Sequence, residues 1–218
     1  MEGVENPGRE RILARIRSAL KSPAPRHGAV KQQAPIFIPV GDPLARFQQE
    51  CAGNVTECIV VPDATAAEEA LHSVLGSVPF GEIYVQDAPL LHRSVQDSND
   101  GHTVRWSSEG PPKESSQATV TLAESLVASH GSVLIASSAG GRGASVVAPV
   151  HIVVASESQL ELDLAAALAH VKQRGLAERN SCLFLITGSS RTADIEKILV
   201  LGAHGPRRLV VILARRLN

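Results

Sequence analysis

A glycine-rich loop with one basic residue could bind an anion. It follows the apolar run 132–136 and consists of Gly140, Gly141, Arg142 and Gly143, which we call the glycine loop. Glycines let a backbone approach a ligand closely, and a guanidinium can pair with a carboxylate or a phosphate. The loop is not a P-loop, because no Gly-Lys-Ser/Thr follows, and it lacks the third glycine and the helix of a dinucleotide fingerprint. The loop is therefore either an anion site or a mobile loop with an exposed Arg142.

A second polar stretch follows the apolar run 183–186. Its hydroxyls, backbone N–H groups and guanidinium could hold a small anion, and they belong to Thr187, Gly188, Ser189, Ser190 and Arg191. Asp194 and Glu196 follow, and their carboxylates would repel a phosphate unless Arg191 or a metal ion lies between. The stretch is therefore either an anion site at a helix N-terminus or a well-capped helix whose first turn is solvated.

Three histidines are weaker candidates for a site. His151 begins an apolar run, where a histidine is more often buried and hydrogen-bonded than catalytic. His204 precedes Gly-Pro at the start of the last apolar run, away from the strand ends where ligands usually bind. His130 precedes the strand expected at 132–136. No Gly-x-Ser-x-Gly surrounds Ser190, so a hydrolase nucleophile is not expected there. The sequence around these residues identifies neither a catalytic group nor a metal site.

Short apolar runs alternate with amphipathic segments along the chain, and this alternation predicts an α/β fold. Because parallel sheets collect the loops that follow their strands at one edge, the glycine loop and residues 187–191 should lie within about 15 Å of each other there. Strands are expected at 58–61, 82–85, 118–121, 132–136, 151–154, 183–186 and 209–213. Helices are expected at 43–51, 65–75, 122–128 and 162–174, and from Thr192 to Gly202.

The N-terminal part reads as a separate element. Residues 9–20 have one apolar stripe and many arginines, and a proline-containing linker follows up to residue 35. The helix either packs back on the domain or docks a partner protein. Residues 36–218 are expected to form a single α/β domain.

Composition excludes several classes of protein. A formal net charge of −1 and 3% aromatic residues argue against binding to nucleic acid. No apolar run approaches the roughly 20 residues of a membrane span, and the charged N-terminus lacks a signal-peptide core, so a cytoplasmic protein is expected. The dispersed cysteines Cys51, Cys58 and Cys182 contain no C-x-x-C pair, so neither an iron–sulfur cluster nor another cofactor is expected in this chain.

Residues 187–196, together with 199–206, resemble the C-terminal signature of the lactate-utilization (LUD) domain, and in particular of the lactate-utilization protein C (LutC/YkgG) family. Residues 8–17 and 149–154 are similar to further parts of that family. The resemblance covers nearly the whole chain and is densest from residue 118 onward. It implies a mostly parallel sheet with helices on both faces, similar to the NagB/RpiA/CoA-transferase and 5-formyltetrahydrofolate cyclo-ligase group.

The resemblance also implies a role as a subunit of the cytoplasmic machinery that oxidises L-lactate to pyruvate, with clusters in two iron–sulfur partner proteins. One position departs from the family: its usual Ala-Glu-Thr-Gly-Thr is Ala-Ser-His-Gly-Ser at 128–132, so Ser129 replaces the acidic residue beside His130. Two other classes stay open. One is a stand-alone enzyme for a phosphorylated or CoA-linked small molecule, and the other is a non-catalytic scaffold for the iron–sulfur proteins.

Overall fold

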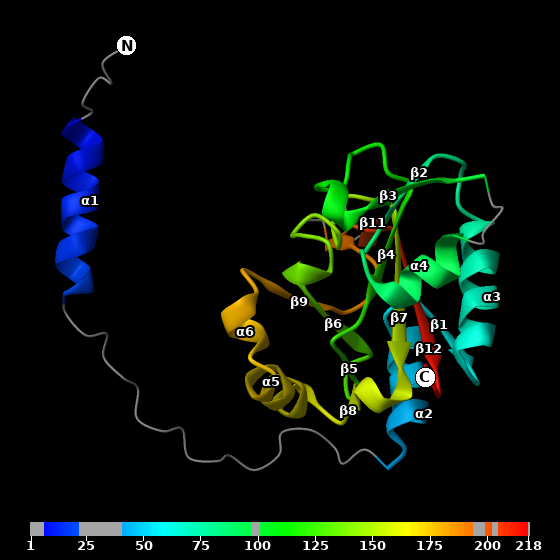
Figure 1. Ribbon diagram of the computed structural model, residues 1–218. Coiled ribbons are helices and arrows are strands. Elements are labelled where there is room, and N and C mark those ends of the chain that lie inside the picture. Colours follow the sequence, from blue (N-terminus) through cyan, green and yellow to red (C-terminus); the bar gives the residue numbers. More distant parts are fainter. Residues whose placement is uncertain (1–6, 22–40, 97–100, 194–198, 202–204, 218) are drawn as a thin grey trace. The chain divides into compact units, whose positions relative to one another are not determined.

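The computed structural model describes residues 7–21, 41–96, 101–193, 199–201 and 205–217 (Figure 1). The chain divides into two units, residues 1–38 and residues 39–218, according to which residues lie close to one another. The first unit contains helix α1 (Pro7–Leu20), which confirms the helix expected at 9–20. Among the described residues, no helix combines the length and the hydrophobicity that crossing a bilayer requires.

The second unit is built on a six-stranded sheet in which every neighbouring pair of strands is parallel. Both faces of this sheet are covered, so its central strands are almost entirely apolar and buried. In spatial order the strands are β1 (Thr56–Val61), β12 (Arg208–Ala214), β7 (Val150–Ser156), β4 (Ala118–Leu122), β2 (Glu82–Val85) and β3 (Thr103–Trp106). This sheet confirms the predicted α/β class, whereas the likeness to the NagB/RpiA group stays a prediction.

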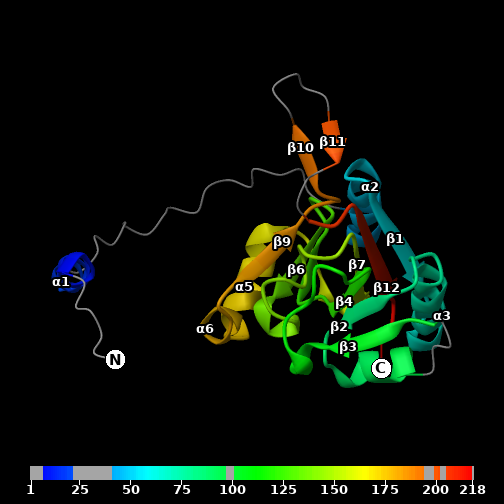
Figure 2. The same ribbon diagram turned by 90° about the horizontal axis from the view of Figure 1, so that it is seen from above.

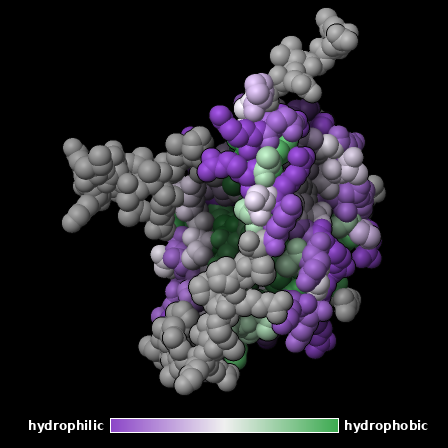
Figure 3. Space-filling model, turned by 90° about the vertical axis from the view of Figure 1, so that its left-hand side faces the viewer, coloured by the Kyte–Doolittle hydropathy of each residue, from purple (hydrophilic) through white to green (hydrophobic). Residues whose placement is uncertain are grey.

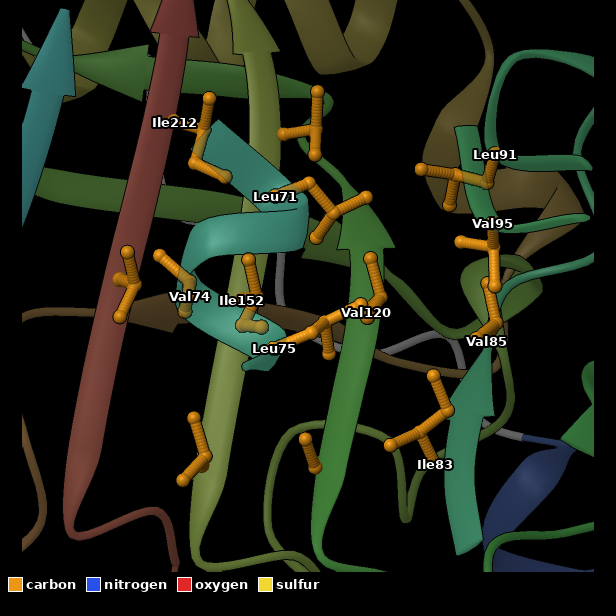
Figure 4. Close-up of a cluster of buried hydrophobic side chains, with 14 of the residues drawn as sticks. Leu71, Val74, Leu75, Ile83, Val85, Leu91, Val95, Val120, Ile152 and Ile212 are labelled. Carbon is orange, nitrogen blue, oxygen red and sulfur yellow. The ribbon is translucent and has the colours of Figure 1, made fainter. Parts of the chain in front are cut away.

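Helices α3 (Ala64–Leu75) and α4 (Pro89–Gln96) cover one face of the sheet. The carboxylate of Asp63 caps α3 by accepting a hydrogen bond from the backbone N–H of Ala66, at 3.0 Å. Figure 4 shows Leu71, Val74 and Leu75 of α3 packed over the strands. The alternate residues of each strand that point to this face form one apolar core with the two helices.

The opposite face packs against helix α2 (Pro43–Gly53) and a second sheet. The α2 helix begins where the sequence predicts, with Asp42 as its N-cap and Pro43 in the first turn. Helices α5 (Leu164–Gln173) and α6 (Leu176–Arg179) pack on the outer face of the second sheet. In spatial order the second sheet contains β8 (Leu160–Glu161), β5 (Ser125–Val127), β6 (Ser132–Ala136) and β9 (Leu183–Ile186), and short 3₁₀ helices lie at Ser107–Glu109, Ser137–Ala139 and Glu157–Gln159.

Two predicted helices are wrong. The segment 122–128 contains strand β5. Pairing with β6 and β8 gives its backbone N–H and C=O groups hydrogen-bond partners, which many of them would lack in so short a helix. The expected helix from Thr192 to Gly202 is replaced by an antiparallel pair, β10 (Arg191–Ala193) and β11 (Leu199–Leu201). Thr192 and Val200 are register partners in it, and β-branched residues favour strands. Figure 2 shows this hairpin apart from both sheets.

The last two predicted strands, 183–186 and 209–213, are therefore not joined by a helix in the part of the chain that the structure describes, and they do not lie in the same sheet. Strand β9 does not join the parallel sheet, but pairs antiparallel with β6 in the second sheet. The strand that follows it, β12, lies between β1 and β7 in the first sheet. The two polar stretches singled out from the sequence thus follow strands of the antiparallel pair β6–β9, and this changes where each of them lies.

Candidate functional site

A pocket of about 470 Å³ lies where β9 ends, between the residues after β9 and the end of α2. We call it the turn pocket, since residues 187–190 form one of its walls. On the side of the molecule where β9 lies in Figure 1, Figure 3 shows hydrophobic residues at the bottom of a recess. The lining residues are Asn54, Ser145, Val146, Phe184, Leu185, Ile186, Thr187, Gly188, Ser189, Ser190, Gly205 and Pro206.

The wall formed by residues 187–190 is held against neighbouring backbone. Gly188 has a φ of 81°, and a Cβ at this position would lie 2.3 Å from the carbonyl oxygen of Asn54, so only glycine fits. The Ser189 hydroxyl donates to the carbonyl oxygen of Val55 at 3.0 Å. The backbone N–H of Ser190 donates to the carbonyl oxygen of Pro206 at 2.8 Å. This part of the pocket is therefore built before any ligand binds.

The Thr187 hydroxyl lies 2.7 Å from the hydroxyl of Ser132, the first residue of β6. One of the two hydroxyls donates to the other, and the hydrogen of the accepting hydroxyl is then free to bind another group. The Ser189 hydroxyl uses its hydrogen in the bond to Val55, but its oxygen can still accept a hydrogen bond from another group. Both hydroxyls of the turn can thus take part in one further hydrogen bond with a bound molecule.

Ser145 is a buried residue of the pocket lining. It is 4% exposed, and its hydroxyl, which has almost no accessible surface, has no hydrogen-bond partner among the described residues. Buried polar groups are nearly always hydrogen-bonded, so this unsatisfied hydroxyl is an unusual feature of the wall. Neither Ser145 nor Asn54 lies in a motif, so nothing in the sequence marks either residue as part of a site.

We expect Ser145→Ala to change the free energy of unfolding by less than about 0.5 kcal/mol, because it removes a buried hydroxyl without a partner. Ser132→Ala is the matched control. It deletes a buried hydroxyl that is bonded to Thr187 and should cost about 1 kcal/mol. Urea denaturation followed by circular dichroism measures both values. An equal loss in the two variants would show that the Ser145 hydroxyl has a structural partner after all.

The glycine loop does not meet the wall formed by residues 187–190. Because β6 and β9 are antiparallel, the residues after β6 lie beside the beginning of β9, and the turn lies at its other end. The Arg142 guanidinium accordingly donates to the hydroxyl and the carbonyl oxygen of Ser181, at 3.3 and 3.4 Å. The Tyr84 hydroxyl donates to the carbonyl oxygen of Gly140 at 2.9 Å and holds the start of the loop. The predicted site shared by Arg142 and the turn is not formed.

Four predicted site residues lie partly or wholly outside the described part of the chain. Arg191 begins β10, directly after the turn, but its side chain lies outside the described part of the chain. Asp194, Glu196 and His204 fall outside the described residues. The lining residues of the turn pocket that the structure describes carry no charge, and they combine hydroxyls and one amide with an apolar strand.

His151 has the buried, hydrogen-bonded environment that the sequence suggests. Its side chain is fully buried, its Nε2 lies 2.9 Å from the hydroxyl of Thr121, and its Nδ1 has no hydrogen-bond partner among the described residues. Burial lowers its pKa from 6.5 to about 4, because a charged imidazolium is poorly solvated there. His151 is therefore neutral at physiological pH.

His130 lies next to the turn pocket. Its Nδ1 is 2.7 Å from the hydroxyl of Ser129. Its carbonyl oxygen accepts a hydrogen bond of 2.9 Å from the side-chain amide of Asn54, which lines the pocket. His130 thus orients a lining residue through its backbone.

The structure also brings together Cys51 and Cys58, which are dispersed in the sequence. The Cys51 thiol donates to the carbonyl oxygen of Gly131 at 3.9 Å. The interaction with Cys58, followed by burial, raises the pKa of the Cys51 thiol well above its usual range. The same interaction lowers the pKa of Cys58. No sequence signal marked the pair, because its members lie on a helix and on the next strand.

The chain is similar to a known protein family and to several relatives. Residues 44–214 match the LUD domain family. The chain is 31% identical over 173 residues to the uncharacterized protein YkgG of Escherichia coli K12, covering 73% of each protein. It is 28% identical over 191 residues to lactate utilization protein C of Bacillus subtilis 168, covering 79% of this chain and 78% of that protein.

A solved structure has a similar fold. It belongs to a DUF162 family protein from Deinococcus radiodurans, with a TM-score of 0.59 and 20% sequence identity, and the match covers 79% of this chain and 96% of that chain. At this identity the likeness concerns the fold alone. The family match spans both sheets and every described residue that lines the turn pocket. The chain belongs to the LUD domain family.

Proposed function

We propose that this chain is a component of a cytoplasmic lactate-utilization system. The observation that carries the proposal is its similarity, over most of the length of both proteins, to relatives named lactate utilization protein C in Bacillus subtilis and in Geobacillus. The match to the LUD family supports it, because it covers the whole domain rather than one motif. Fold alone would not support a function, since one fold serves many chemistries.

We further propose that the chain acts with iron–sulfur partner proteins in the oxidation of L-lactate to pyruvate. This oxidation removes two electrons, which need an acceptor that a cofactor usually provides. A [2Fe–2S] or [4Fe–4S] cluster usually takes four cysteine ligands, and this chain has three cysteines in all. The redox centres are accordingly assigned to the partners, and this chain would supply binding and positioning.

The turn pocket is the part of the chain that we assign to ligand binding. A small hydroxy acid needs hydrogen-bond donors and acceptors for its hydroxyl, and the hydroxyls of Thr187 and Ser189 offer them. Its carboxylate needs a cation, and two basic residues directly follow lining residues along the chain, Arg191 after Ser190 and Arg207 after Pro206. The described lining by itself supplies hydrogen bonds without positive charge, so anion binding would depend on these arginines.

The test uses an organism from which the gene for this chain has been deleted. We expect growth on L-lactate as the carbon source to fail and to return with the wild-type gene. A Val146→Phe variant tests the turn pocket: Val146 lines it and is 47% exposed, so a larger side chain fills the pocket with little strain in the core. Leu168→Phe on α5 is the matched control, because Leu168 is also exposed, at 53%, but lies outside the pocket.

Each outcome has one meaning. Growth with Leu168→Phe but not with Val146→Phe supports a ligand role of the pocket. Growth with both variants, together with recovery of iron-containing proteins on the tagged chain, supports a scaffold instead. Normal growth of the deletion strain on L-lactate contradicts the proposed function altogether.

A further inference from the structure

A second pocket, of about 480 Å³, lies at the carboxyl ends of β7 and β12 in the parallel sheet. We call it the carboxyl-edge pocket. Figure 1 shows the residues that follow β7 near the C-terminal end of the chain. Its lining residues are Ser156, Ser158, Gln159, Arg215, Arg216 and Leu217. None of them lines the turn pocket, and none was singled out in the sequence.

The position of this pocket follows from the topology of the sheet. After β1 the chain enters α3, which covers one face, whereas after β7 it enters β8, which belongs to the sheet on the other face. Strand β12 lies between β1 and β7. Where neighbouring connections leave toward opposite faces, the strand ends leave an open crevice, and ligands of parallel α/β sheets usually bind there.

One wall of the pocket is rigid without a ligand. The backbone N–H of Ser156 donates to Gln159 Oε1 at 2.7 Å, and Gln159 Nε2 donates to the carbonyl oxygen of Ala123. The hydroxyls of Ser156 and Ser158 lie 2.9 Å apart. One of them donates to the other, so the hydrogen of the accepting hydroxyl is free for a bound molecule.

The opposite wall carries two positive charges. The backbone N–H of Arg215 donates to the carbonyl oxygen of Val61 at 2.9 Å, which fixes the chain just past β12. The Arg215 guanidinium is 63% exposed and lies 3.9 Å from the carboxylate of Glu157, too far for a hydrogen bond. Arg216 forms no ion pair with any residue in the described part of the chain. Arg215 and Arg216 thus both line the pocket, and of the two only Arg215 has an ion-pair partner among the described residues.

We propose that the carboxyl-edge pocket binds a small molecule that carries a phosphate group. A phosphate offers several acceptor oxygens and up to two negative charges, which suits two guanidinium forks and a free hydroxyl better than a single carboxylate does. The volume exceeds what a three-carbon acid would fill and lies in the usual range for larger ligands. Leu217 offers apolar contact for the rest of the molecule. This inference does not rest on the proposed function.

Calorimetric titration of the full chain with inorganic phosphate, at low ionic strength, tests the proposal. The test variant is the double substitution Arg215→Gln and Arg216→Gln. The matched control is Arg11→Gln with Arg15→Gln, which removes the same charge from α1, where neither residue lines the pocket. We expect phosphate to bind the wild type and the control equally and the test variant at least about tenfold more weakly. Circular dichroism checks that all three proteins are folded.

Equal binding to all three proteins, or no binding to the wild type, overturns the proposal. A parallel titration with L-lactate separates phosphate from carboxylate recognition. If L-lactate binds with the same dependence on Arg215 and Arg216 and phosphate does not, the site recognises carboxylates and the phosphate assignment is wrong. These results do not depend on whether the deletion strain grows on L-lactate, so the two proposals can fail separately.

Discussion

Replacing Gly188 by alanine is expected to lower the free energy of unfolding by roughly 2–5 kcal/mol. Two costs add up in this variant. A left-handed backbone with a φ of 81° costs a residue with a Cβ about 1–2 kcal/mol. In addition, the new Cβ would lie 2.3 Å from the carbonyl oxygen of Asn54, so the backbone at the end of α2 or after β9 must move. Such overpacking typically costs a further 1–3 kcal/mol or so.

Gly141→Ala separates these two costs. Gly141 also has a left-handed backbone, with a φ of 76°, but a Cβ there would meet no atom within 4 Å. This variant should lose only the conformational cost of about 1–2 kcal/mol. Urea denaturation of the three proteins gives the difference between the variants, which measures the contact of Gly188 with Asn54. Equal losses would mean that the backbone around the turn pocket is free to move, contrary to the built wall described above.

The stability of the domain is expected to fall by about 3 kcal/mol between neutral pH and pH 4 through His151 alone. The folded pKa of His151 is about 4 and its ordinary value is 6.5, so between these values the unfolded chain binds a proton that the folded chain does not. The contribution of His151 is therefore complete above pH 6.5 and is lost as the pH falls toward 4. The difference of about 2.5 pKa units, at 1.36 kcal/mol each, gives the total.

Comparison of the wild type with His151→Gln isolates this effect from the carboxylates that titrate in the same range. Glutamine can still bond to the Thr121 hydroxyl but does not titrate. The pH dependence of the unfolding free energy between pH 7 and 4 should be shallower in the variant by about 3 kcal/mol. Nuclear magnetic resonance of the imidazole in the wild type is a second measurement that needs no variant. An imidazole that becomes charged near pH 6.5 in the folded protein would contradict the prediction.

Local signals in the sequence determined several elements of this protein correctly. Helix α2 is marked by Asp42 as N-cap followed by a proline, and these side-chain and backbone preferences act within one turn. Strand β2 was expected at 82–85 and lies at Glu82–Val85. The alternation of apolar runs with amphipathic helices also predicted the α/β class, because each run must be buried against another element.

Only the tertiary structure decided which strands pair and where the pockets lie. A run of four or five apolar residues looks the same whether it joins a parallel or an antiparallel sheet, so the sequence did not place β6 and β9 in the second sheet. Their antiparallel pairing separates Arg142 from the turn after β9, and the turn pocket is lined by Ser145 and Asn54 instead. The rule that parallel strands collect ligands at their carboxyl ends points to β7 and β12, with Arg215 and Arg216. Strand partners are set by contacts between residues far apart in the chain, which local preferences do not encode.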